Sequence, residues 1–314
     1  MSNTSHTFPA PIGGVPAQID FAPSILFVIL YAFLSILAIY RLARSSSRSL
    51  VLAGTVAFVV ERIIIYSLRA SEAHSHSQNE SHSITQYWQT TFLIGYISIL
   101  GSCVSSLQCV LVDTTLPQKP TQTDGEAGKA ISSVGQSENS SATSSSENDI
   151  EDDPKARTFY RRLCAVLAVL SWNPILLGVV AGVIYTGGEA YAAAATVAQA
   201  LRYASIILAF VQISAVQLLS IWAYLCIPKI RRSAVLLIGA IISLLLVITI
   251  YHLAIMTLHT TSLYSGPLNG TGSKALFYVF QAAPEWLASL VLFAVNVREI
   301  CGTGAWGDRF GSKK

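Results

Sequence analysis

The chain has 314 residues, of which 52% are hydrophobic and only 12% are charged, and its mean hydropathy is +0.53. Soluble domains carry about 25% charged residues, so this composition excludes a soluble domain and indicates a polytopic membrane protein. The formal net charge of +3 is small, and where the charges lie is more informative than their sum.

The chain begins with a polar segment, residues 1–22, that contains no Lys or Arg. The first apolar run follows it and ends in Arg41 and Arg44 rather than in a small-residue cleavage site. A cleaved signal peptide has a basic start and such a site. We therefore expect a retained first span and an extracellular amino-terminal segment.

Seven apolar stretches reach the roughly 20 residues with which a helix crosses the hydrocarbon layer. They lie at about Pro23–Leu42, Leu50–Leu68, Trp88–Leu111, Leu163–Tyr185, Val197–Ile227, Ala234–Leu258 and Ala275–Asn296. The sequence therefore predicts an all-α, seven-transmembrane-helix bundle, with three spans in residues 23–111 and four in residues 159–297.

The basic residues predict the orientation of this bundle. Apart from Arg62, Arg69, Arg202 and Lys274, every Lys and Arg falls in the first, third or fifth loop or in the tail, residues 298–314. The positive-inside rule makes this side cytoplasmic, so the amino terminus is expected outside. Three glycosylation tripeptides, at Asn3, Asn79 and Asn269, then fall in outward segments, which predicts a glycoprotein of the plasma membrane.

The third loop, residues 112–158, is rich in Ser and acidic residues and almost free of aromatic ones. Such a composition predicts a disordered cytoplasmic segment. A solvated linker is the favoured interpretation, and a docking segment controlled by phosphorylation is the alternative.

Several polar residues fall at membrane depth. Counting 1.5 Å per residue places Glu61 and Arg62 near the midplane in span two and Glu285 at the same level in span seven. Pro284, beside Glu285, is expected to kink its helix. The outer halves of spans five to seven add four further polar or aromatic residues: Arg202, Tyr251, His252 and Gln281.

Charges at membrane depth are costly and need partners. We expect Glu61 and Glu285 to pair with Arg62 and Arg202. Two interpretations stay open. One is an outward-opening polar cavity that binds a ligand, with Arg202, His252 and Gln281 near its mouth. The other is an ion-pair network that only locks the helices together.

Six stretches carry a resemblance to a group of fungal seven-helix proteins. They are Glu61-Arg62 with Arg69, Arg202-Tyr203-Ala204-Ser205, Thr260-Thr261-Ser262-Leu263, the Gly272–Phe280 stretch, Pro284-Glu285-Trp286-Leu287-Ala288 and the tail Gly302–Asp308. Over nearly its whole length the chain resembles this group, labelled family C-like G-protein-coupled receptors. The resemblance implies a receptor or sensor with a cytoplasmic signalling partner.

A more distant resemblance is to the fungal lipid-translocating exporter family, linked to lipid and drug resistance. It rests on an acid in span two followed by Tyr66 and Arg69, and on the final span, where Gln281 replaces that family's acid. This resemblance implies a lipid-handling or membrane-stress-resistance protein without G-protein coupling.

The expected ligand is therefore an unknown small molecule or lipid, and the expected partners are membrane lipids and a signalling protein, with no nucleic acid. An enzyme is not expected, and neither is a cofactor. Zinc needs three or four ligands, whereas His252 is the one histidine inside a predicted span. Retinal is not expected because the final span lacks an internal lysine.

Overall fold

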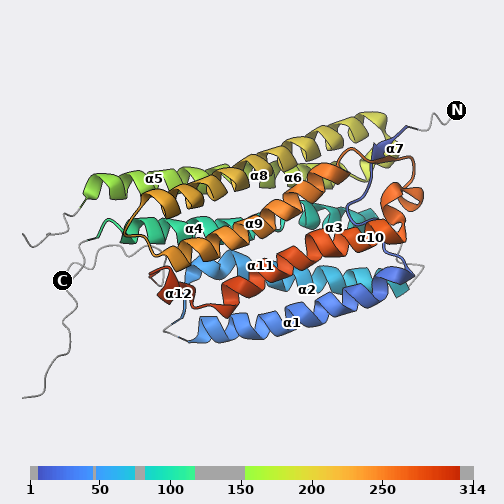
Figure 1. The fold of residues 1–314 in the computed structure, drawn as a ribbon. Helices are drawn as coiled ribbons and strands as arrows, with labels where there is room; N and C mark the ends of the chain where they lie inside the picture. Colours follow the sequence, from blue (N-terminus) through green and yellow to red (C-terminus); the bar gives the residue numbers. More distant parts are fainter. Residues whose placement is uncertain (1–5, 45–46, 75–81, 117–152, 305–314) are drawn as a thin grey trace, which may run out of the picture.

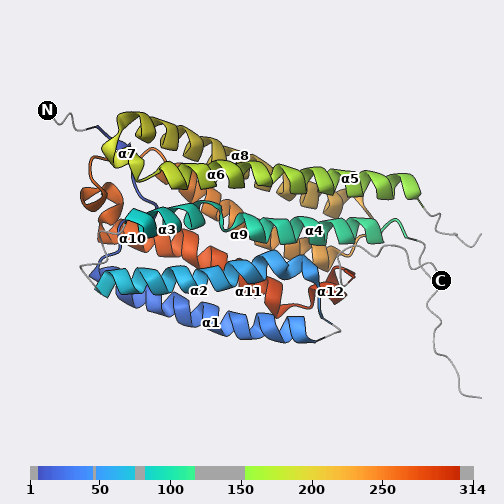
Figure 2. The ribbon, with the colours of Figure 1, turned by 180° about the vertical axis from the view of Figure 1, so that it is seen from behind.

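The computed structural model describes residues 6–44, 47–74, 82–116 and 153–304. Within these ranges seven helical stretches are long and apolar enough to cross a membrane, which confirms the predicted all-α seven-helix bundle (Figures 1 and 2). They are Gln18–Ala43, Leu50–His74, Ser83–Asp113, Pro154–Ile184, Ala192–Cys226, Arg232–Ile255 and Thr271–Ala294.

Several of these spans consist of more than one helical segment. The α-helices are α1 (Phe21–Ala43), α2 (Ala53–His74), α3 (His82–Ile94), α4 (Ile97–Asp113), α5 (Pro154–Leu170), α6 (Trp172–Ile184), α7 (Gly187–Ala190), α8 (Ala192–Cys226), α9 (Arg232–Ile255), α10 (Thr271–Phe277), α11 (Ala283–Ala294) and α12 (Val297–Ile300). A π-helix, η5 (Tyr278–Ala282), joins α10 to α11, and two-residue strands β1 (Phe8–Pro9) and β2 (His259–Thr260) pair antiparallel. Short 3₁₀ turns are η1 (Gln18–Asp20), η2 (Leu50–Leu52), η3 (Leu263–Ser265) and η4 (Pro267–Asn269).

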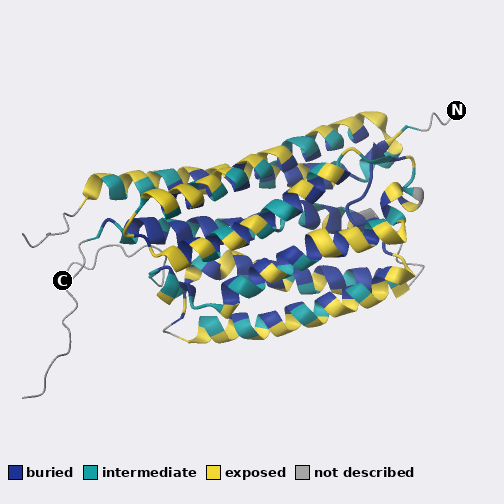
Figure 3. Cartoon of the chain, viewed as in Figure 1, coloured by how far each residue is buried: buried dark blue, intermediate teal, exposed yellow. Residues whose placement is uncertain are grey.

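The third span, α3 with α4, lies at the centre of the bundle. About two thirds (67%) of its apolar window is buried, against 22% for the span formed by α5 and α6. α3 packs on α6, and α4 packs on α2, α5, α8 and α9, while α1 packs on α2 and α11. Buried residues line the inward faces of the helices and exposed apolar residues line the outward faces (Figure 3). An apolar outer face is what a lipid environment requires.

Small residues set the contact between α6 and α3. A Cβ added at Gly178 would lie 2.2 Å from Ile94, and one at Gly182 would lie 1.9 Å from the Thr90 hydroxyl. The sequence shows these glycines as a GxxxG pair, which predicts a close helix contact. That prediction is confirmed, and the partner is α3 of the same chain.

Residues 6–20 do not extend away from the bundle as a polar tail. Every residue from 8 to 16 is buried, and β1 pairs with β2, so the segment lies inside the end of the bundle that also carries α7 and α10 (Figure 1). This end is called the N-terminal end below, and the opposite end, at α12, the C-terminal end. The sequence predicted only a polar, extracellular segment over residues 1–22 and gave no sign that residues 8–16 are buried.

The predicted disordered loop, residues 112–158, is also too long at both ends, since α4 continues to Asp113 and residues 154–158 are helical. α5 begins at Pro154, because the Asp153 side chain accepts hydrogen bonds from the backbone N–H groups of Lys155 and Ala156 and so caps the helix. Pro154 fits the first helical position, where a backbone N–H is not needed. Residues 117–152 of that loop lie outside the described residues, as do Asn3 and Asn79.

Candidate functional site

Three of the predicted site residues meet near the middle of the bundle. Arg62 on α2 donates from Nε and Nη2 to the two carboxylate oxygens of Glu285 on α11, at 2.8 and 2.9 Å. Its Nη1 donates to Glu61 at 3.0 Å. The side chains of Arg62 and Glu285 are fully buried, whereas that of Glu61 is 24% exposed. Both acids that were predicted to pair with Arg62 and Arg202 thus contact Arg62.

The bundle is shaped to hold the Arg62 guanidinium. Its Cζ lies 4.5 Å from the ring centre of Phe58 and 5.2 Å from that of Phe92, so aromatic faces solvate the charge. Nη2 also donates to the Thr91 carbonyl at 3.2 Å. Gly95, where α3 ends, leaves the necessary space, because a Cβ there would lie 2.5 Å from Nη2. A residue with no side chain is therefore required next to this cation.

The seventh span is locally unwound beside this ion pair. η5 is a π-helix that ends at Ala282, and α11 starts at Ala283, so that Pro284, which lacks a backbone N–H, lies in the first turn of α11. π-turns inside helices often occur at functional positions. The kink expected from Pro284 takes this form.

Gln281, within η5, connects the site to two further helices. Its Oε1 lies 3.1 Å from Nε2 of His252 on α9, and its Nε2 donates to the Phe92 carbonyl on α3 at 3.0 Å. All three residues are fully buried. Gln281 and His252, which the sequence placed at similar depth, are thus brought together.

Tyr251 and Arg202 do not contact the ion pairs that Arg62 forms with Glu61 and Glu285. Tyr251 is 7% exposed, and its ring stacks on Phe280 with ring centres 6.4 Å apart. Arg202 on α8 was predicted to pair with an acid, but it pairs with none among the residues that the structure describes. It donates from Nη1 to the backbone carbonyl of Ala10 at 2.9 Å, and its Cζ lies 5.9 Å from the ring centre of Tyr185.

The expected mouth of a cavity is closed by the amino-terminal segment. Arg202, His252 and Gln281 are at most 4% exposed, so none of them lines an open mouth. Gln89 on α3 holds Ile12 by both backbone groups: the amide oxygen accepts from Ile12 N at 2.9 Å and the amide nitrogen donates to Ile12 O at 3.1 Å. The segment therefore lies against α3 and, through the Ala10 carbonyl, against Arg202.

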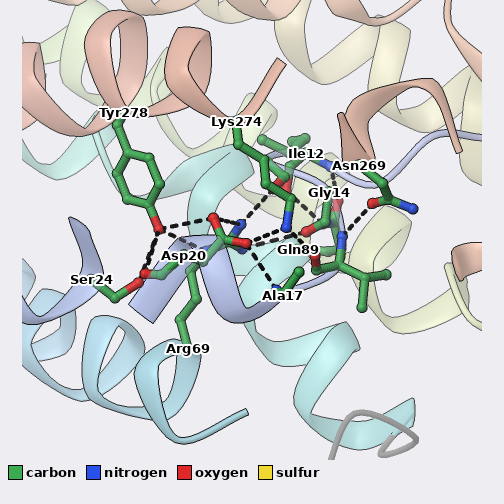
Figure 4. A network of polar contacts seen from close by, with 12 residues as sticks. Ile12, Gly14, Ala17, Asp20, Ser24, Arg69, Gln89, Asn269, Lys274 and Tyr278 are labelled. Carbon is green, nitrogen blue, oxygen red and sulfur yellow. Dashed lines mark hydrogen bonds and ion pairs between the residues drawn. The ribbon is translucent and has the colours of Figure 1, made fainter. Parts of the chain in front are cut away.

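A second buried ionic cluster fastens the end of this segment (Figure 4). Asp20 is fully buried between Arg69, whose Nη2 lies 3.2 Å from Oδ1, and Lys274, whose Nζ pairs with Oδ2. Tyr278 donates its hydroxyl to Oδ1 at 3.2 Å, and its oxygen lies 2.9 Å from that of Ser24. We call these five residues the Asp20 cluster. It joins η1, α1, α2 and the seventh span.

The cluster also binds the backbone of the amino-terminal segment. Lys274 Nζ donates to the Val15 carbonyl at 2.8 Å, and Arg69 donates to the carbonyls of Gly13 and Gly14. Both glycines have positive φ angles, 72° and 63°, which side-chain-bearing residues rarely adopt. The sharp turn they form presents these carbonyls to the cations.

Sequence reasoning missed the Asp20 cluster because it assigned residues 1–20 no contact with the bundle. A signal was present: Arg69 and Lys274 are two of the few basic residues on the side that basic residues otherwise avoid. Asp20 is the one acid in the first 20 residues and directly precedes the first span. Two cations near the ends of spans on an otherwise uncharged side indicate a buried acid partner.

Within the described ranges no group of three or more His, Cys, Asp or Glu side chains could hold a metal ion. Comparisons with family models, with curated protein sequences and with solved structures each gave no match to this chain. The functional argument therefore rests on the residues and their geometry.

Proposed function

We propose that this chain is a receptor-like or sensor protein of the membrane that responds to a small-molecule or lipid ligand at its N-terminal end. The observation that supports the proposal is Arg62, held between Glu61 and Glu285 at mid-span. Intramembrane ionisable residues are costly and are functional by default. A structural lock alone would not need the unwound turn η5 beside it.

A continuous set of buried contacts runs from the amino-terminal segment to this ion pair. Gln89 binds Ile12, and Phe92, one turn further along α3, accepts from Gln281 through its carbonyl. Gln281 lies one turn from Glu285, the partner of Arg62. A ligand that moves residues 8–16 would therefore shift α3 and η5, and with them the ion pair. Coupling of this kind requires an element with two arrangements, and we propose that η5 is that element.

The orientation and partners follow from the same proposal. The N-terminal end faces outward, the membrane is the plasma membrane, and the C-terminal end meets a cytoplasmic signalling protein. At that end Arg231 pairs with Asp113 at 3.2 Å and donates to the Glu299 carbonyl at 2.9 Å, which links α9, α4 and α12. A movement of the seventh span would change the surface offered to that partner.

A nucleotide-exchange assay tests this proposal. The full chain, in lipid nanodiscs, is mixed with the heterotrimeric G protein of the same cell, and basal guanine-nucleotide exchange is measured for the wild type and for Glu285→Gln. We expect the variant to change the basal exchange rate, since the ion pair that holds α2 to α11 is weakened. An unchanged rate in a variant that elutes as a monodisperse, folded protein would contradict G-protein coupling.

A lipid-handling role is the alternative, and two observations favour it. The Glu61 side chain, on α2 at mid-span, is 24% exposed. A groove of about 320 Å³ also lies between α1 and α2, lined by Phe21, Ile25, Val28, Ser67, Ala70, Ser71 and His74. Fluorescent lipid analogues in proteoliposomes provide the test: translocation by the wild type that Glu61→Gln abolishes would favour this role over the receptor.

A further inference from the structure

Four basic residues inside the bundle are buried: Arg62, Arg69, Arg202 and Lys274. Among the residues that the structure describes, the other three each pair with an acid, and Arg202 does not. It is 4% exposed, and its described hydrogen bond is the one to the neutral carbonyl of Ala10. A guanidinium has five N–H donors and is best satisfied by a carboxylate that accepts two of them. Burying it against one carbonyl is an unusual arrangement, because unpaired buried charge is costly.

The groups around Arg202 form a site that binds a main chain. Residues 8–9 pair with β2, the Ala10 N–H donates to the Leu258 carbonyl at 2.9 Å, and the Tyr185 hydroxyl donates to the Pro9 carbonyl at 2.8 Å. Phe8 fills an apolar pocket made with Val15, Tyr185, Ala195 and Leu263. Addition of an extended chain to a strand edge, with a pocket for one side chain, is a recurring mode of peptide recognition.

We propose that this site binds the free carboxyl end of a short peptide, and that residues 6–10 occupy it as an internal substitute. An external peptide would place an aromatic side chain in the Phe8 pocket and end at the position of Ala10. Its terminal carboxylate would then present one oxygen where the Ala10 carbonyl lies and the second where the nitrogen of Pro11 lies. Arg202 would gain the charged, two-oxygen partner that it lacks in the internal arrangement.

The inference deepens the proposed function, because it names the ligand class for the N-terminal end. Residues 6–10 are covalently attached and therefore have a high effective concentration at the site, so an external peptide must compete with them. The test therefore uses a variant in which only the binding of residues 6–10 to the site is weakened. Phe8→Lys removes the aromatic anchor and adds a cation near Arg202, while every residue of the site itself stays unchanged.

The probe is the peptide His-Thr-Phe-Pro-Ala, labelled at its amino end and prepared with either a free carboxyl or an amidated end. Binding to the full-length Phe8→Lys chain in nanodiscs is followed by fluorescence anisotropy. We expect the free acid to bind at least about tenfold more tightly than the amide, because a charge-assisted pair replaces a neutral hydrogen bond. Adding Arg202→Gln should abolish that difference, and a peptide with Asp in place of Phe should not bind.

Phe8→Ala serves as a second weakened chain should the lysine variant not be monodisperse. Equal affinities of acid and amide, an acid preference that survives Arg202→Gln, or no binding to a folded variant would each overturn the inference. No G protein is present in this assay. The two proposals can therefore fail separately. If the peptide binds in this assay but the nucleotide-exchange assay shows no coupling, only the signalling role is overturned. If the peptide does not bind, only the peptide site is overturned.

Discussion

Arg62 and Glu285 form a two-pronged ion pair inside the bundle, with Nε 2.8 Å from one carboxylate oxygen and Nη2 2.9 Å from the other. The pair joins α2 to α11 across 223 positions of sequence. Both side chains are fully buried, so each charge depends on the other for compensation. This dependence makes single substitutions informative.

Glu285→Gln should destabilise the bundle strongly. Breaking a buried ion pair by removing one partner costs about 3–5 kcal/mol, because the remaining charge stays buried. Glu61→Gln is the matched control, since Glu61 is partly exposed and leaves the two-pronged pair intact; we expect it to cost about 1 kcal/mol or less. The free energy of unfolding in detergent measures both. Equal losses for the two variants would contradict the assignment of Glu285 as the main partner.

Gly95→Ala should displace the Arg62 guanidinium. The added Cβ would lie 2.5 Å from Nη2, and the guanidinium cannot retreat without lengthening its bonds to Glu285. Overpacking of this kind costs about 1–3 kcal/mol. Gly101→Ala, on α4, is the control, because nothing lies within 4 Å of its added Cβ. Alanine there should be neutral or stabilising, as it favours helix by up to about 1 kcal/mol. If thermal unfolding ranks the two variants the other way, the Gly95 contact is not a constraint.

The spans could be predicted from the sequence because run length and hydropathy are local properties. Depth along a helix is also local, and it correctly brought Glu61, Arg62 and Glu285 to one level and His252 near Gln281. The direction in which a side chain points around its helix depends on packing that the sequence does not show. Arg202 was therefore assigned an acid, although its actual partner is a backbone carbonyl of residue 10.

Residues 8–16 show the other limit of sequence reasoning. Pro, Gly and small residues in this stretch are typical of a loop, and a loop is expected at the surface. Its burial depends on donors that the bundle supplies, such as Gln89 for Ile12, Arg69 for Gly13 and Lys274 for Val15. These partners come from three distant parts of the chain, so no local pattern indicates them.

Asp20 and Lys274 should be coupled energetically. Asp20→Asn leaves Arg69 and Lys274 buried beside a neutral side chain, at a cost of about 3 kcal/mol for the lost charge. Lys274→Met alone leaves Asp20 with Arg69 and should cost less. The double variant should be less destabilised than the sum of the two, with a coupling of about 1–3 kcal/mol. Hydrogen exchange over residues 8–16 gives a second readout, since loss of the cluster should raise their exchange rates. Additive losses would show that the two side chains do not interact.

Cys301 and Cys226 should differ sharply in reactivity. Cys301, directly after α12, is 1% exposed, and its burial raises the pKa of the thiol to about 11 although nearby Arg231 opposes the shift. The thiolate is the reactive form, so a raised pKa lowers the reactive fraction at every pH below that value. Cys226, at the end of α8, is the one exposed thiol of the five. At about neutral pH, N-ethylmaleimide should label Cys226 first. Mass spectrometry of the intact chain should show one added group, with Cys226→Ser abolishing it. Rapid labelling of Cys301 in the folded protein would mean that the contact of α12 with the bundle opens readily.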